Sequence, residues 1–128
     1  MNRAAVILGV ALSLACATGN RNPDLVIDIG NSMIAPGTGF TIMFKEVPGD
    51  SRCPTDVTCV QAGNAQVLLE VKGVDGSQRT VLLNTTEGPS EVTVGKLLIH
   101  LVRLDPQPLS SVPASARKYS VVLHVTQP

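Results

Sequence analysis

This chain has few aromatic residues and no excess of charge of either sign. Trp is absent, and the 128 residues include only 2 Phe and 1 Tyr. Sites that stack nucleotide bases or sugars are usually built on aromatic side chains, so no such platform is expected. The basic and acidic residues are balanced at 10 each, and no segment forms the concentrated basic face that phosphate binding needs. The composition therefore argues against a nucleic-acid partner.

The motifs of several enzyme classes are also missing. The sequence has no Gly-x-Ser-x-Gly elbow of a serine hydrolase and no Cys-x-x-Cys pair of a thiol oxidoreductase. Ser110 and Ser111 lie in a proline-bearing connection without an assigned base. We therefore expect no enzymatic activity and no cofactor.

The amino-terminal segment is apolar, and no later segment of the sequence is a comparable candidate for an export signal or a membrane span. Arg3 precedes an uncharged apolar segment, residues 4–15, that ends in small residues. This segment is about a dozen residues long, against the roughly 20 needed to span a bilayer, which is typical of an export signal. Residues 1–17 are therefore predicted to be a signal peptide, and residues 18–128 a single domain.

Cys16 leaves two outcomes open for the end of the signal. Ala15-Cys16-Ala17 fits ordinary cleavage, which would remove Cys16 and release a soluble chain. Residues 12–16 also resemble a bacterial lipobox, although Ser13 stands where leucine is expected. In that case Cys16 becomes the lipidated first residue and attaches the protein to a membrane. We favour the lipoprotein, so the expected location is periplasmic or anchored to the outer membrane, with secretion as the alternative.

Two cysteines, Cys53 and Cys59, remain in the exported part. Thiols in small exported domains usually pair, so we predict a disulfide. The closed loop is short and would contribute roughly 2 kcal/mol by loop-entropy arithmetic. Two cysteines cannot complete a tetrahedral zinc site without further ligands.

Apolar residues recur at every second position in short segments separated by Gly and Pro, which is the pattern of β-strands. An Asp75-Gly76 pair is typical of a tight hairpin turn. About seven short strands without a normal helix predict an all-β fold, an antiparallel immunoglobulin-like β-sandwich. The expected strands cover residues 25–29, 40–45, 65–72, 81–83, 92–94, 97–102 and 119–126, and the longest irregular pieces cover residues 48–63 and 105–117.

The loop with the two cysteines resembles a known pattern. Asp50-Ser51-Arg52-Cys53-Pro54, followed by Val57-Thr58-Cys59 and Gly63-x-Ala65, looks like a family of small bacterial exported proteins and lipoproteins of unknown function. The resemblance implies a secreted β-sandwich with a bridged loop and implies no activity. One departure is Gln61, where the family often has Trp.

Asp50, Arg52 and Asp56 flank the bridge and form the candidate binding loop. Arg52 on a rigid loop could enter the pocket of a trypsin-like protease, because a preorganised loop loses little entropy on binding. Alternatively, Arg52 pairs with an aspartate and organises the turn, which the Asp-Ser sequence favours. The two aspartates could also bind calcium, although no Asp-x-Asp-x-Asp-Gly pattern is present.

His100 and His124 are the only histidines, and the alternation predicts that both point away from the core. They could form a metal site if the strand register places them opposite each other, but a third ligand is not evident. No metal site is therefore predicted.

The expected function is that of a structural or binding module in the cell envelope or outside the cell. Its partner would be an unknown envelope protein or a small ligand. A module that binds a small ligand should show a pocket lined by residues such as Met43, Leu68 or Leu98. The alternative is a secreted protease inhibitor that uses the loop around Arg52.

Overall fold

The computed structural model describes residue 9 and residues 23–127. Cys16, and with it nearly all of the expected signal peptide, lies outside the described residues. The strands are β1 (Leu25–Asp28), β2 (Ser32–Ile34), β3 (Thr41–Asp50), β4 (Ala65–Lys72), β5 (Gln78–Asn84), β6 (Glu91–Val94), β7 (Leu97–Asp105) and β8 (Ser120–Thr126), and a short 3-10 helix, η1 (Ala114–Ala116), precedes β8.

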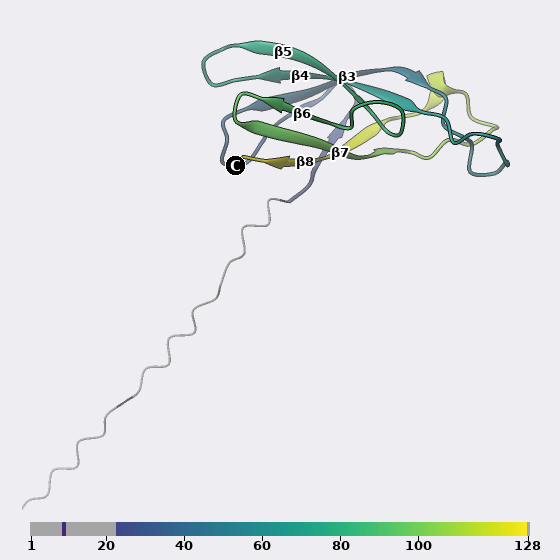
Figure 1. The fold of residues 1–128 in the computed structure, drawn as a ribbon, viewed down its shortest axis with the longest axis horizontal. Coiled ribbons are helices and arrows are strands. Elements are labelled where there is room, and N and C mark those ends of the chain that lie inside the picture. Colours follow the sequence, from purple (N-terminus) through teal and green to yellow (C-terminus); the bar gives the residue numbers. More distant parts are fainter. Residues whose placement is uncertain (1–8, 10–22, 128) are drawn as a thin grey trace, which may run out of the picture.

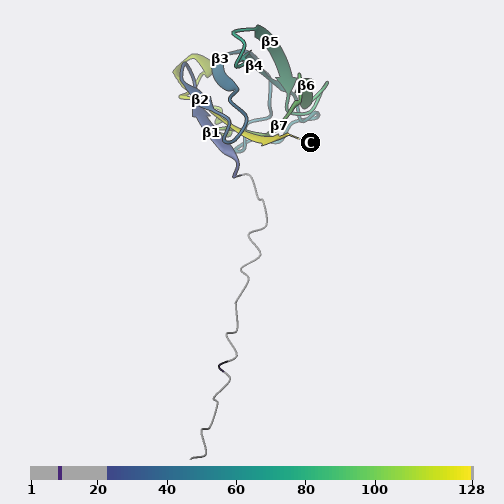
Figure 2. The same ribbon diagram turned by 90° about the vertical axis from the view of Figure 1, so that its left-hand side faces the viewer.

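The strands form two antiparallel four-stranded sheets packed as a sandwich (Figures 1 and 2). The β8 sheet has the order β1-β8-β7-β6, and the β3 sheet has the order β2-β3-β4-β5. The predicted antiparallel β-sandwich is confirmed. Except for β1 beside β8, paired strands are consecutive in the chain. The strands therefore follow one another around the sandwich, unlike the Greek-key connections of immunoglobulin domains.

Alternation along the strands explains the core between the sheets. In β4, Ala65, Val67, Leu69 and Val71 are buried, and the residues between them are half-buried. Fully burying one such aliphatic side chain contributes roughly 1.5–3 kcal/mol, so these rows hold the sheets together. The opposite layer supplies Leu25, Ile27, Leu97, Ile99, Val121 and Leu123 to the same core.

The turn between β4 and β5 is the predicted tight hairpin. Gly76 has a φ of 83°, in the left-handed region that glycine adopts without steric cost. The carboxylate of Asp75 accepts the backbone N–H of Ser77 at 3.0 Å, which closes the turn.

Two features of the strands differ from the sequence-based prediction. The three residues of β2 are all exposed, so they lack the buried alternation that reveals a strand. β3 continues to Asp50, past the expected start of the irregular piece at residue 48. Pro48 fits within it because the register shifts between Glu46 and Gly49, and a bulge tolerates the missing N–H of proline.

The disulfide loop, defined here as residues 51–64, lies at one end of the sandwich, at the right of Figure 1. The connection between β7 and β8 lies at the same end, whereas the C-terminus and the β4–β5 turn lie at the opposite end. In the described part of the chain, no helix has the length and apolar character needed to cross a bilayer.

Candidate functional site

The base of the disulfide loop continues the pairing of β3 with β4. The N–H of Ser51 donates to the carbonyl oxygen of Asn64 at 2.8 Å, and the N–H of Cys53 donates to that of Ala62 at 2.9 Å. The two arms of the loop therefore remain antiparallel beyond the ends of the strands. This pairing makes the base of the loop an extension of the sheet.

Gly63 is required by this close approach. Its φ is 71°, and a Cβ atom there would lie 1.8 Å from the carbonyl oxygen of Ser51. Any larger residue would push the two arms apart. Two residues later Ala65 is fully buried, so the Gly-x-Ala part of the motif has a steric explanation.

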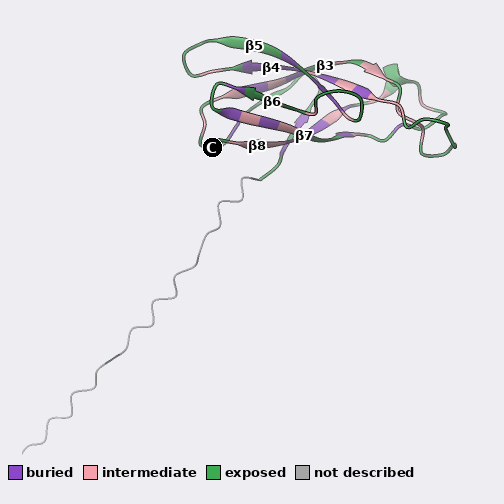
Figure 3. Cartoon of the chain, in the orientation of Figure 1, coloured by how far each residue is buried: buried purple, intermediate pink, exposed green. Residues whose placement is uncertain are grey.

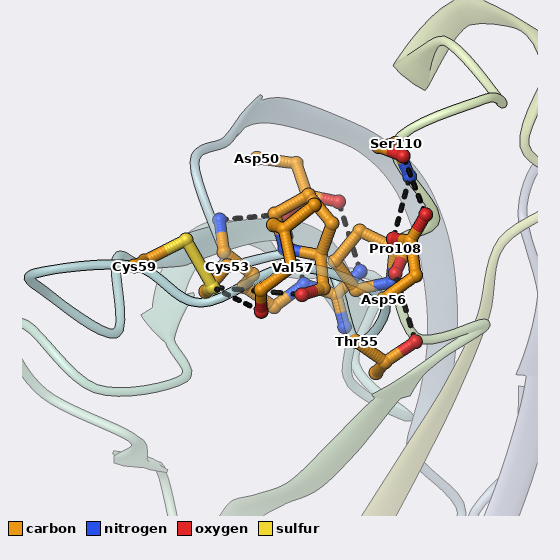
Figure 4. Close-up of a disulfide and its surroundings, with 10 residues drawn as sticks. Asp50, Cys53, Thr55, Asp56, Val57, Cys59, Pro108 and Ser110 are labelled. Atoms are coloured by element: carbon orange, nitrogen blue, oxygen red, sulfur yellow. Dashed lines mark hydrogen bonds and ion pairs between the residues drawn. A yellow bond between two sulfur atoms is a disulfide. The ribbon is translucent and has the colours of Figure 1, made fainter.

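Cys53 and Cys59 form a disulfide with their Cα atoms 5.9 Å apart, which confirms the predicted bridge. Figure 4 shows Thr55 and Asp56, which lie between the two cysteines in the chain, next to Pro108 and Ser110. The N–H of Thr55 donates to the carbonyl oxygen of Pro108 at 2.9 Å. The loop is thus closed on itself by the disulfide and hydrogen-bonded to the β7–β8 connection.

Asp56 provides a second contact with the same connection (Figure 4). Its carboxylate accepts the N–H of Ser110 at 2.9 Å and also the hydroxyl of that residue. These two hydrogen bonds lower the pKa of Asp56 below its ordinary value. Asp56 is exposed, but its carboxylate is already engaged in docking the loop.

The carboxylate of Asp50 is the centre of a buried ionic network in which its side chain is only 1% exposed. Arg52 donates from Nε to Oδ1 and from Nη2 to Oδ2, both at 2.8 Å. Arg117 donates from Nη1 to Oδ2 at 2.9 Å, and the hydroxyl of Tyr119 donates to the same oxygen at 2.8 Å. One carboxylate therefore joins the end of β3 to the segment that leads into β8.

The two guanidinium groups also bind backbone carbonyl groups. Arg52 donates to the carbonyl oxygens of Leu104 at 2.7 Å and Pro106 at 3.0 Å. Arg117 donates from Nη2 to the carbonyl oxygen of Val112 at 3.1 Å, while its Nε is buried without a hydrogen-bond partner. The network thus extends from β3 to the end of β7 and into the β7–β8 connection.

The charge state of this network follows from its surroundings. Burial acts to raise the pKa of Asp50, but hydrogen bonds from Arg52 and Tyr119 and the charge of Arg52 outweigh it and lower the pKa from 3.8 to about 2. Burial also raises the pKa of Tyr119, with a further contribution from Asp50. At neutral pH the carboxylate is therefore ionised and the phenol carries its proton.

Two of the three residues of the candidate binding loop have side chains that face inward. The side chain of Arg52 is 9% exposed, so entry into a protease pocket would require it to leave Asp50 and two carbonyl groups. A calcium ion at Asp50 would have to displace both guanidinium groups. Arg52 pairs with Asp50, one of the two alternatives that the sequence left open, and both side chains of the pair are buried.

Arg117 and Tyr119 are the members of the network that sequence reasoning missed. They lie 67 and 69 residues after Asp50. No local spacing connects groups so far apart in the chain. Only the packing of the β7–β8 connection against the end of β3 brings them together.

A cleft of about 360 Å³ lies between the base of the loop and β7. Its lining includes Arg52, Gly63, Thr85, Thr86, Leu101 and Leu104. Met43, Leu68 and Leu98, around which a pocket was expected, are not part of that lining.

The loop end also exposes apolar side chains. Val57 and Leu109 are each 45% exposed, and Val60 is fully exposed. Figure 3 shows this end of the sandwich as largely exposed. Because residues 55 and 56 are hydrogen-bonded to residues 108 and 110, the segments that carry Val57 and Leu109 are held next to each other.

The histidines face outward, as predicted, and the register places His100 opposite His124 on β7 and β8. Both side chains are nearly half exposed. Across residues 23–127, no group of three or more His, Cys, Asp or Glu side chains is arranged to hold a metal ion.

Comparison with protein families, curated proteins and solved structures finds no significant match for this chain. The resemblance of the loop to exported bacterial proteins therefore stays a prediction. The disulfide is compatible with export, because such bridges persist in oxidising compartments.

Proposed function

We propose that this protein is a non-enzymatic binding module of the bacterial cell envelope, and that its disulfide-loop end contacts an envelope protein. The observation that carries this proposal is the apolar tip, defined here as the exposed side chains of Val57 and Val60 on the disulfide loop and of Leu109 on the β7–β8 connection. The bridge and the contacts with Pro108 and Ser110 support a loop that is already ordered before it binds.

An ordered apolar tip favours association for two reasons. Little conformational entropy remains to be lost on binding, and apolar surface is removed from water at roughly 25 cal/mol per Å². Single exposed apolar residues are common on protein surfaces, so the proposal depends on three of them lying at one ordered end of the sandwich. A protein partner is favoured over a small ligand because the disulfide loop extends from the end of the sandwich (Figure 1).

Site-specific crosslinking in living cells tests this proposal. A photo-activated amino acid at Val60 is expected to capture a defined envelope protein. The matched control is the same amino acid at Val74, which is 82% exposed at the β4–β5 turn, at the opposite end of the sandwich. Equal capture at both positions, or capture at neither, would overturn the proposal.

A second variant separates contact from proximity. Val57→Asp combined with Val60→Asp places charge on the tip without touching the bridge or the Asp50 network, and it is expected to abolish co-purification of the captured protein. Val74→Asp should leave co-purification unchanged. Co-purification that survives the double substitution would place the binding surface elsewhere.

Export through the predicted signal and a lipid on Cys16 are part of the same proposal, supported by the disulfide and by the resemblance of the loop. If Cys16 is lipidated, the wild-type protein partitions with membranes, and Cys16→Ala releases it or blocks processing. Purified wild-type protein whose first residue is Thr18 would instead establish ordinary signal cleavage.

A further inference from the structure

Four polar side chains form a row across the outer face of the β8 sheet. The register places His100 opposite His124 and Glu91 opposite His100. Asp24 immediately precedes β1, where Leu25 is opposite Leu123, so Asp24 lies beside His124. The order across the sheet is Asp24, His124, His100 and Glu91.

Each imidazole has a carboxylate beside its Nδ1 atom. Nδ1 of His124 lies 2.8 Å from Oδ1 of Asp24. A carboxylate can only accept a hydrogen bond, so this contact favours a proton on Nδ1 and leaves the lone pair on Nε2 free.

His100 shows the same arrangement in a looser form. Its Nδ1 is shielded from solvent without a hydrogen-bond partner and lies 3.8 Å from Oε2 of Glu91. The side chain is nevertheless 46% exposed, so the accessible part of the ring is the part away from Nδ1. Both imidazoles therefore present Nε2 as the nitrogen available to a ligand.

We propose that His100 and His124 bind one divalent transition-metal ion through their Nε2 atoms, with Cu²⁺ preferred over Zn²⁺. Residues directly opposite in an antiparallel pair have Cβ atoms about 4.5–5.5 Å apart, which allows two imidazoles to converge on an ion about 2 Å from each nitrogen. Cu²⁺ precedes Zn²⁺ in the general order of affinities of nitrogen ligands for divalent metals.

Asp24 acts as a positioning residue in this site. A carboxylate that accepts the proton of Nδ1 fixes the ring orientation and makes Nε2 a better ligand. Oε2 of Glu91 lies 3.8 Å from Nδ1 of His100, too far for a hydrogen bond in this structure, so Asp24 is the carboxylate whose geometry fits this role.

The site is open, because no third ligating side chain converges with the pair among the residues that the structure describes. Water molecules complete the coordination. The bound ion is therefore exchangeable and does not hold the fold together, unlike the closed four-ligand sites of structural zinc.

Titration of the chain with Cu²⁺, and in parallel with Zn²⁺, tests the proposal by calorimetry. The protein carries Cys16→Ser, so that neither a lipid nor a thiol is present at this position, and has no histidine tag. The expected result is saturable binding of one ion per chain, which His100→Ala and His124→Ala each abolish. Electron paramagnetic resonance of the Cu²⁺ complex should show coordinated imidazole nitrogen, which distinguishes this site from binding at the chain's amino terminus.

Asp24→Asn tests the positioning role and is expected to weaken Cu²⁺ binding roughly tenfold. The matched control is Asp28→Asn, because Asp28 lies on β1 and contacts Ser120 rather than a histidine. Circular dichroism verifies that every variant is folded. Wild-type affinity in both histidine variants, or no saturable binding of either metal at micromolar concentrations, would overturn the site. Equal affinities of Asp24→Asn and Asp28→Asn would overturn the role of Asp24.

Discussion

Two fastenings hold the disulfide loop, and they differ in how much of the molecule they connect. The bridge joins Cys53 to Cys59, only six positions apart. The network around Asp50 reaches Arg117 and Tyr119, 67 and 69 positions away. The covalent link therefore restricts one loop, whereas the ionic network ties the end of β3 to the segment that leads into β8. We therefore expect the noncovalent fastening to contribute more to the stability of the fold than the disulfide.

The largest effect is expected from Asp50→Ala. This change leaves two guanidinium groups buried without their carboxylate, and breaking a buried ion pair costs about 3–5 kcal/mol of unfolding free energy. Urea denaturation followed by circular dichroism measures the loss. Asp56→Ala is the matched comparison, since it removes an exposed carboxylate of the same loop with its two hydrogen bonds to Ser110, and it should cost clearly less. Equal losses of unfolding free energy in the two variants would show that the buried network contributes no more to stability than an exposed carboxylate.

Arg52→Ala should cost less than Asp50→Ala, because Asp50 keeps Arg117 and Tyr119. Hydrogen bonds to charged groups contribute about 1.5–3 kcal/mol, and we expect a loss in this range rather than the ~1 kcal/mol of an exposed pair. Urea denaturation decides between the two values.

The same variant tests the inhibitor hypothesis in assays with several trypsin-like proteases. The hypothesis is favoured only if the wild-type protein inhibits at micromolar concentrations and Arg52→Ala does not.

Replacing both cysteines of the bridge with serine is expected to cost about 2 kcal/mol, since the closed loop is short. The variant should remain folded and β-rich because the Asp50 network is intact. Thermal unfolding measures the loss, and mass spectrometry with and without reductant verifies the bridge in the wild-type protein. Complete unfolding of the double variant would reverse the proposed ranking of the two fastenings.

Acid should weaken the same network without any substitution. The pKa of Asp50 falls from 3.8 in the unfolded chain to about 2 in the folded protein, so the unfolded state binds the proton more readily. The contribution of about 2 kcal/mol is present above pH 4 and is lost as the pH falls to 2. Urea denaturation between pH 6 and pH 2 should show this loss in wild-type protein and a smaller one in Asp50→Asn.

The smallest effect is expected at the tip. Val60 is fully exposed and makes no contact that the fold needs, so Val60→Asp should change the free energy of unfolding by less than about 0.5 kcal/mol. A larger loss of unfolding free energy in urea denaturation would mean that Val60 packs on the sandwich. The base of the loop and its tip would then both contribute to stability.

The sequence alone determined the features that depend on neighbouring residues. The alternation in residues 65–72 and 119–126 predicted strands whose inward residues are indeed buried, because the period of a strand brings every second side chain to one face. The Asp75-Gly76 turn and the Cys53–Cys59 bridge were predicted for similar local reasons.

The tertiary structure alone decided which distant groups meet. Asp50 was recognised as part of the loop, but its partners Arg117 and Tyr119 lie 67 and 69 residues later in the sequence. His100 and His124 were known to be the only histidines, yet only the register of β7 against β8 places them opposite each other. A shift of one residue in that register would have turned one of them to the other face, and no local pattern contains the pairing of strands.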